Sequence, residues 1–473
     1  MEKIEPQEHL ENGNAVPSSR DTTIEEFDHQ RSKLLNRRLD RRILPLCSLL
    51  YLLNFLDRGN IANAKVLNQE TGDDLLQKTG MTASGYSLTV TLFSLAYTLF
   101  EVPSNWIMKH YVRPSIWLAT LLGCWGALTL GFAGVQNYAT VLALRLLIGV
   151  FEAGFFPGIV YLITIWYRHD ERSVRIAVVI AFCNLAGAFG GCIAYGLGTV
   201  NGGGGLEGFR WLFILEGIIT LLCVLPTLLI LPDYPARAKF LSPSEKKFAE
   251  DRLKERGGGY SREHATREEI LETFFSPRML AHYLAYIANV VTQGSFTFFT
   301  PTIVTGLGYT SIQAQLLTVP PWVVGFVVAI VVSYSADRFD ARGWHIVAIS
   351  TIGGLGWLIA GLLPTTAYVQ RYGCLVVAAV GAFPGAPSMT AWVSCNSPSL
   401  LTIPFAIALH NSCAGIGQII AQWIWVDNDT GNFTCAACNF FVAIVAFSLR
   451  IWYGRMNGKG IKDARGEKRV WSY

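Results

Sequence analysis

Long apolar stretches alternate with short polar connectors along almost all of the 473 residues. A helix that crosses a bilayer needs about 20 mostly apolar residues. The apolar stretches, together with the turn and charge signals between them, predict twelve membrane-spanning helices. We expect these helices at residues 43–62, 84–106, 115–134, 139–165, 176–198, 210–231, 279–304, 313–334, 344–364, 372–394, 403–425 and 434–454. The pattern therefore predicts an all-α integral membrane protein.

A polar segment at 232–277 divides the predicted helices into two sets of six. It contains a helical-looking run, Ser244 to Glu255, in which basic and acidic residues nearly balance. The expected organisation is a tail at 1–42, a six-helix bundle at 43–231, a central loop at 232–277, a six-helix bundle at 278–454 and a tail at 455–473. Two bundles that rock about a site at the bilayer midplane are expected for this layout.

Composition agrees with a membrane protein and excludes several other classes. Only 15% of the residues are charged, against about 25% in soluble domains. The net charge of +4 is too mild to favour nucleic acid as a partner. The ten cysteines are scattered, mostly within apolar runs, so neither a disulfide framework nor a metal site is expected. We find no nucleophile–base pair and no phosphate-binding loop, so the pattern predicts no cofactor and no enzyme.

The distribution of basic residues predicts the orientation. Short loops rich in Lys and Arg stay cytoplasmic, and here they lie on the side that also receives both tails. The first residues are too polar for a cleavable signal peptide, so the first span is expected to insert as an uncleaved anchor. Two glycosylation sequons, at Asn428 and Asn432, fall in the predicted outer loop before the last helix. That loop is short and close to the bilayer, which disfavours modification.

Charged residues inside the first six spans are the main candidates for chemistry. A charge at the bilayer centre costs roughly 2.5–3.5 kcal/mol, so such groups should line a cavity or have a partner. Arg58 is expected to hold an anionic substrate, because a guanidinium matches a carboxylate with two parallel hydrogen bonds. Asn54 shares its face of the helix at i, i+4 spacing. Asp57 and Glu152 are expected to accept the protons. The alternative is that these groups form buried pairs that tie two helices together.

For three further buried charges, Arg145, Glu101 and Glu216, a structural role is the favoured interpretation, because they lie near helix ends or packing glycines. The second half has almost no charge within its spans. Its candidate substrate contacts are polar and aromatic residues, namely Asn289, Gln293, Trp322 and Asn411. Each of these alone is more often a helix-packing group than a ligand contact. His410 is either a proton relay or a histidine simply hydrogen-bonded in place.

Specific motifs resemble known families. The run from Ser335 to Gly343 resembles the cytoplasmic loop signature of the major facilitator superfamily, and Arg145 to Gly154 looks like the motif of its fourth helix. This resemblance implies structural or gating roles for Arg145, Asp337, Arg338 and Arg342.

A closer resemblance covers nearly the whole chain. The runs Leu39 to Pro45, Tyr51 to Ile61, Phe100 to Asn105, Gly149 to Pro157, Arg210 to Gly217 and Leu231 to Pro235 look like the fungal allantoate permease type of anion:cation symporter. The resemblance implies proton-coupled uptake of organic anions such as ureide acids, nicotinate, pantothenate or biotin. It also implies that Asp57, Arg58 and Glu152 act in proton coupling and substrate binding, because they occupy those motif positions.

Three functional hypotheses remain. The leading one is proton-coupled uptake of a small organic anion, with protons and the lipid bilayer as the other partners. The second keeps the fold and reverses the direction, as an exporter of a secondary metabolite. The third is a nutrient sensor that binds its ligand without transporting it. The family resemblance implies the plasma membrane, and a monomer suffices for the mechanism.

Overall fold

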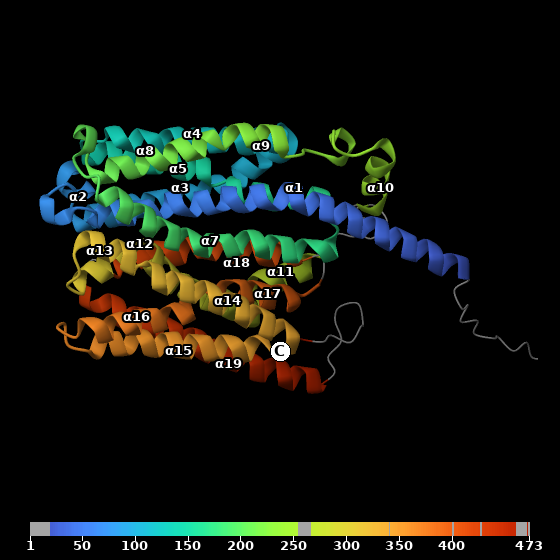
Figure 1. Cartoon of the computed structure of the whole chain (residues 1–473). Coiled ribbons are helices and arrows are strands. Elements are labelled where there is room, and N and C mark those ends of the chain that lie inside the picture. Colours follow the sequence, from blue (N-terminus) through green and yellow to red (C-terminus); the bar gives the residue numbers. More distant parts are fainter. Residues whose placement is uncertain are drawn as a thin grey trace, which may run out of the picture.

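The computed structural model describes residues 19–253, 266–339, 341–399, 402–425, 428–459 and 471 (Figure 1). Every regular element among these residues is a helix. The long helices lie side by side, with α2 (Leu75–Thr79) at one end of the bundle and α10 (Pro243–Leu253) at the other (Figure 1). We call these the α2 end and the α10 end.

The first half runs from α1 to α9. Besides α2, its helices are α1 (Ser19–Val66), α3 (Ala83–His110), α4 (Pro114–Gly131), α5 (Tyr138–Glu152), α6 (Phe155–Trp166), α7 (His169–Gly198), α8 (Gly208–Leu222) and α9 (Val224–Ile230). It also has 3₁₀ turns at Gln69–Thr71, Phe132–Gly134 and Gly203–Gly205. One difference from the expectation concerns the first helix. It begins at Ser19, within the segment expected to be a tail, because polar residues continue the same helix beyond its apolar part.

The central segment carries a 3₁₀ turn (Pro235–Arg237), α10 and α11 (Arg267–Phe275). The second half then comprises α12 (Pro277–Gly306), α13 (Ser311–Leu317), α14 (Val319–Phe339), α15 (Arg342–Leu362), α16 (Tyr368–Ala382), α17 (Gly385–Cys395), α18 (Ile403–Trp423) and α19 (Asn428–Lys459). Each of the twelve predicted spans is covered by one of these long helices or by a consecutive pair, which confirms the all-α membrane fold.

Four spans are broken pairs of helices, and proline explains each break. The pairs are α5–α6, α8–α9, α13–α14 and α16–α17. The second helix of each pair carries a proline at its third position, namely Pro157, Pro226, Pro321 and Pro387. Proline lacks a backbone N–H, and the first turn of a helix is where no intrahelical partner is needed for that group. The sequence therefore favours a new helix start within each of these spans.

Composition separates the helices into two groups. Eight of the spans in the described residues are long and apolar enough to cross a membrane. The other four, α1, α3, α12 and α18, carry many of the buried polar residues within their length. Large apolar side chains such as Leu99, Leu229 and Ile444 are exposed on the outside of the bundle. These residues would face lipid, since a soluble protein rarely leaves so many apolar side chains in water.

The two halves contact each other at the α2 end. Five hydrogen bonds join the halves among the described residues, and all of them lie toward this end. The Tyr86 hydroxyl donates to the Phe298 carbonyl at 3.0 Å, and the Ser87 hydroxyl donates to the Gln422 carbonyl at 2.7 Å. Lys65 of α1 lies over the ring of Phe299 in the other half, 5.1 Å from its centroid. A buried aromatic cluster from both halves surrounds these contacts. The two halves are therefore in close contact at this end.

Glycine on α7 allows this closure. A Cβ atom on Gly191 would lie 2.4 Å from the Thr318 hydroxyl and 2.6 Å from the Gln315 carbonyl oxygen of the other half. A Cβ atom on Gly187 would lie 2.1 Å from the Trp322 ring. The backbone of α7 thus approaches the second half more closely than any other residue type would permit.

Replacing Gly191 with alanine should therefore open the α2 end, because the added methyl group overlaps atoms of the second half. We expect hydrogen–deuterium exchange of residues 311–318 to become at least severalfold faster. Gly196→Ala is the matched control on the same helix, since a Cβ atom there would meet nothing within 4 Å. Equal exchange in the two variants would show that this contact does not hold the halves together.

Candidate functional site

A buried ion pair joins α1 to α5. Both Nε and Nη2 of Arg58 donate to Oε1 of Glu152, at 2.9 and 2.5 Å. Each residue is at most 5% exposed. The second carboxylate oxygen of Glu152 has no hydrogen-bond partner among the described residues, and neither has the Nδ2 amide of neighbouring Asn54. Asn54 lies beside the Glu152 carboxylate, so an amide and an ion pair meet at this point between α1 and α5.

Aromatic rings surround the Arg58 guanidinium. The rings of Phe55, Phe93 and Tyr97 lie 5.1, 5.3 and 4.8 Å from its carbon. Phe93 and Tyr97 belong to α3. Gly149 of α5 allows α3 to pack closely, since a Cβ atom at this position would lie only 2.6 Å from the Phe93 carbonyl oxygen. Rings around a guanidinium stabilise its charge while keeping water away. The aromatic surroundings of Arg58 thus suit an anion that also carries apolar surface.

Asp57 makes a second polar cluster with α4 and α8. Its Oδ2 accepts hydrogen bonds from Trp125 Nε1 at 2.7 Å and from the Thr220 hydroxyl at 3.2 Å. Glu216, one turn before Thr220, lies beside Asp57, and neither of its oxygens receives a hydrogen from a described donor. Two buried carboxylates side by side repel each other, and a proton on one of them would relieve that repulsion.

Arg145 lies near both clusters. It is buried on α5, with the rings of Phe132 and Phe93 at 5.2 and 6.0 Å. We find no hydrogen bond or ion pair for its guanidinium in the described part of the chain, and its Nε is buried without a partner. Its charge acts on Glu152 and on Glu216 at longer range. Arg145 thus supplies a second buried positive charge to the first half.

The fully buried charges of this region can be counted. Arg58 and Arg145 supply two positive charges, while Asp57, Glu152 and Glu216 supply up to three negative ones. Buried charges in an apolar region are costly unless they are compensated. A single proton on one of the carboxyl groups makes this cluster neutral, and the Asp57–Glu216 contact is where the geometry accommodates it.

The candidate residues of the second half are not all brought to this region. Asn289 of α12 faces α16 and α17. Its amide donates to the Gly381 carbonyl at 3.3 Å and packs against Gly385. His410 is fully buried and stacks on Tyr286 at 3.7 Å. Asn289 thus contacts neighbouring helices of its own half, whereas neither ring nitrogen of His410 has a hydrogen-bond partner among the described residues. Gln293 and Asn411 are partly buried on α12 and α18, and the hydrogen bonds and ion pair that Arg58 makes within the described part of the chain go to Glu152 instead.

Trp322 is the second-half candidate that meets the first half. Its ring lies 4.5 Å from that of Phe383 in a tilted arrangement, and it lines a small cavity of about 30 Å³ between α1, α7, α12 and α14. Gly59 and Asn63, which follow Arg58 on α1, line the same cavity. Such a volume holds about one water molecule. A substrate larger than water would need the halves to move apart here.

The motif residues of the α14–α15 connection lie at the α10 end. Arg338 is exposed at the end of α14, and Arg342 donates to the Cys395 sulfur at 3.2 Å. The Asp337 side chain lies outside the described residues. The two sequons, expected in a loop, instead fall at the start of α19. Asn432 is only 7% exposed and packs beside Gly361, while the Asn428 side chain is not among those described. The helix extends farther than expected because Asn, Asp and Thr begin it well.

Two contacts of this site do not follow from the sequence pattern. The pattern favours a structural role for Glu216, and the structure places it beside Asp57, which lies on a helix far away in the sequence. Trp125 is not among the sequence candidates, although its indole N–H donates directly to Asp57. The available signal was the indole N–H of Trp125, a hydrogen-bond donor within the otherwise apolar helix α4, which needs a buried acceptor. Among the described residues, no group of three or more His, Cys, Asp or Glu could hold a metal ion.

Comparison with known proteins identifies the family. Residues 47–422 match the Major Facilitator Superfamily. The chain is 45% identical over 434 residues to the MFS transporter prlL of a fungal species (strain NRRL 50135), covering 90% of this chain and 88% of that protein. It is 33% identical over 402 residues to the MFS-type transporter cnsO of Penicillium expansum, covering 82% and 76%.

Solved structures show the same fold at low sequence identity. The crystal structure of a D-xylose-proton symporter superposes with a TM-score of 0.64 at 13% identity, covering 86% of this chain and 97% of that one. An inward-facing bacterial homologue of the human lysosomal transporter Spinster gives 0.63 at 15% identity, covering 86% and 96%. The described helices, the buried charges and these relatives agree that the chain belongs to the major facilitator superfamily and is a membrane transporter, not an enzyme.

Proposed function

We propose that this protein takes up a small organic anion together with protons by alternating access. One observation carries the proposal. The Arg58 guanidinium, the group best suited to bind a carboxylate substrate, donates its hydrogen bonds to Glu152. The anion and Glu152 compete for the same hydrogen-bond donors. Substrate binding and the charge of Glu152 are therefore coupled.

This competition explains why a proton should accompany the anion. When the substrate takes the Arg58 donors, Glu152 loses its partner while it remains buried. An unpaired buried carboxylate is strongly disfavoured, so Glu152 takes up a proton at that point. Loading the anion and the proton together keeps the buried charge unchanged, which lowers the cost of moving the site across the bilayer. Release of the anion returns Glu152 to Arg58 and frees the proton.

The Asp57–Glu216 contact offers a second proton-binding position. Asp57 precedes Arg58 by one residue on α1. It faces α4 and α8, whereas Arg58 faces α3 and α5. Closure at the α2 end supports a state that loads or releases substrate toward the α10 end. We assign the α10 end, with both termini, to the cytoplasm and the protein to the plasma membrane.

The subfamily assignment belongs to the same proposal. The runs around Asp57, Glu152 and Glu216 resemble the allantoate permease type of anion:cation symporter, and all three carboxyl groups belong to the buried charge cluster. This placement supports a carboxylate-bearing vitamin or metabolite as the substrate. The aromatic rings around Arg58 favour an anion with an apolar body.

Uptake of a labelled carboxylate panel by yeast that lacks its own carriers of this type tests the proposal. We expect accumulation of at least one member of the panel, stronger in acidic than in neutral medium. Lack of uptake of every member, with the protein shown to be at the cell surface, would favour export instead. Outward flux from preloaded vesicles would then identify an exporter.

Glu216→Gln should alter the coupling without unfolding the protein, because an amide can donate the hydrogen bond that a protonated carboxyl donates to Asp57. We expect uptake in neutral medium to rise relative to uptake in acidic medium, since the shared proton is no longer required. The measurement is the ratio of initial uptake rates in the two media. Thr227→Val is the control on the following helix, because its hydroxyl bonds only the Cys223 carbonyl. An unchanged ratio in Glu216→Gln would remove this pair from the mechanism.

A further inference from the structure

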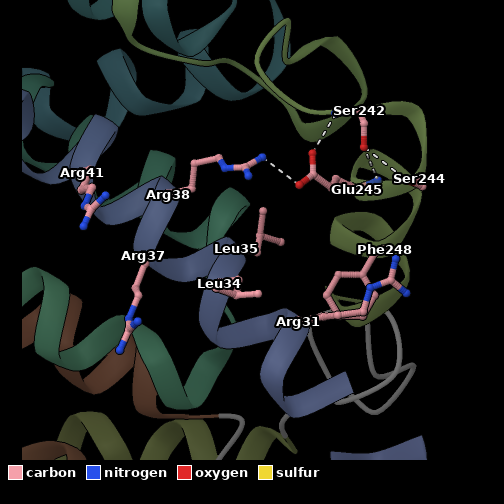
Figure 2. Close-up of a pocket in the computed structure, with 10 residues that line it drawn as sticks. All are labelled: Arg31, Leu34, Leu35, Arg37, Arg38, Arg41, Ser242, Ser244, Glu245 and Phe248. Carbon is pink, nitrogen blue, oxygen red and sulfur yellow. Dashed lines mark hydrogen bonds and ion pairs between the residues drawn. The ribbon is translucent and has the colours of Figure 1, made fainter. Parts of the chain in front are cut away.

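A basic pocket lies at the α10 end, outside the transport path. It has a volume of about 750 Å³ and is formed by the start of α1 and by the α10 segment (Figure 2). Arg31, Arg37, Arg38 and Arg41 of α1 line it, opposite Glu245. Figure 2 shows Arg38 reaching across to Glu245, whereas Arg37 and Arg41 extend from α1 on the side away from α10.

The pocket has more positive charge than its own residues neutralise. The only carboxylate that lines it, Glu245, is paired with Arg38 at 2.7 Å. Arg37 and Arg41 are exposed and make no hydrogen bond or ion pair with any residue that the structure describes. The Glu245 carboxylate also accepts a hydrogen bond from the Ser242 backbone N–H, which lowers its pKa and keeps it ionised. Two guanidinium groups are thus left for an external anion.

The end of the pocket nearest the bilayer, at Arg41, lies at the depth of the lipid headgroups, and Arg37 lies just beyond them. α1 is one continuous helix, so Arg41 and Arg37 precede Ile43, where the apolar part begins, by about 3 and 9 Å along its axis. The headgroup layer of a bilayer is about 5–7 Å thick on each side. Leu34 lies between the arginines and is 65% exposed, so an apolar surface borders the charged one.

We propose that this pocket binds the phosphorylated headgroup of an anionic phospholipid. Guanidinium groups match phosphate oxygens with paired hydrogen bonds. Clusters of arginine directly beside a membrane span attract anionic lipids. The exposed Arg38–Glu245 pair is weak in water, so a phosphate can also take Arg38 from Glu245.

Native mass spectrometry of the purified full-length protein with added phosphatidylinositol 4-phosphate tests this site. We expect one tightly bound lipid per protein, and about 10- to 30-fold weaker binding in the Arg37→Gln/Arg41→Gln variant. Lys109→Gln/Lys239→Gln removes two exposed charges from the same end outside the pocket and should bind like the wild type. Glu245→Gln should bind more tightly, because the competing carboxylate is gone.

Three results would overturn the proposal. The first is the absence of retained lipid, and the second is an equal loss in both double variants, which would indicate diffuse attraction to the whole surface. The third concerns the source of the phosphate. Soluble inositol 1,4-bisphosphate offers the same phosphates without acyl chains, and we expect it to bind at least tenfold more weakly. Equal binding would assign the pocket to a soluble phosphate.

Discussion

Arg58→Gln should abolish uptake of the substrate anion in both acidic and neutral medium. The variant removes the donors that Glu152 holds and that the proposed substrate needs. Breaking a buried pair by removing one partner costs about 3–5 kcal/mol. If the same donors hold the anion, the apparent affinity should fall by at least about 100-fold, since 1.4 kcal/mol corresponds to a factor of ten. Initial uptake rates against substrate concentration measure this loss.

Arg58→Lys separates geometry from charge. Lysine keeps the positive charge but loses the two N–H groups that donate together to Glu152. We expect a loss of about 10- to 100-fold in apparent affinity, between wild type and Arg58→Gln. Lys109→Gln, an exposed residue at the end of α3, is the control for a lost charge and should transport normally. Full activity in Arg58→Lys would mean that the residue acts only as a point charge.

The fold follows from sequence more completely than the site does. Apolar length decides whether a segment can cross a bilayer, and this property is local, so helices such as α12 and α15 lie within a few residues of their predicted spans. The breaks within spans are also local, because the prolines at the third position of α6 and α9 act on their own helices. The apolar pattern predicts the membrane span within α1 but not the helical turns before it, because polar composition does not prevent a helix in water.

The site depends on which helices become neighbours, and no local pattern contains that information. The i, i+4 spacing correctly places Asn54 near Arg58 and Glu152, since both lie on the face of α1 toward α5. The Asp57–Glu216 contact needs α8 to pack beside α1, which sequence spacing cannot indicate. The same limit applies to Asn289, whose amide faces α16 within its own half. Polar residues in a span predict a buried partner but not which one.

Glu152→Gln should prevent accumulation against a gradient while leaving substrate exchange intact. The amide cannot take up or release a proton in the transport cycle, so the proposed coupling is lost. Arg58 remains available to the anion, and it is no longer occupied by a competing charge. We therefore expect uptake driven by an acidic medium to fall at least tenfold, whereas exchange of labelled for unlabelled substrate in preloaded vesicles continues at a rate near that of wild type.

A carboxylate outside the membrane-spanning segments provides the control for this result. Hydrogen bonds from Lys78, Asn201 and Thr71 lower the pKa of Asp73 to about 2. A group with a lowered pKa changes charge only as the pH falls toward that value, so Asp73 stays ionised in both media. Asp73→Asn should thus leave the ratio of acidic to neutral uptake unchanged. Loss of both accumulation and exchange in Glu152→Gln, with Asp73→Asn normal, would assign Glu152 to binding or folding. Loss of accumulation alone would leave proton transfer as its role, because only net transport needs the proton to be released.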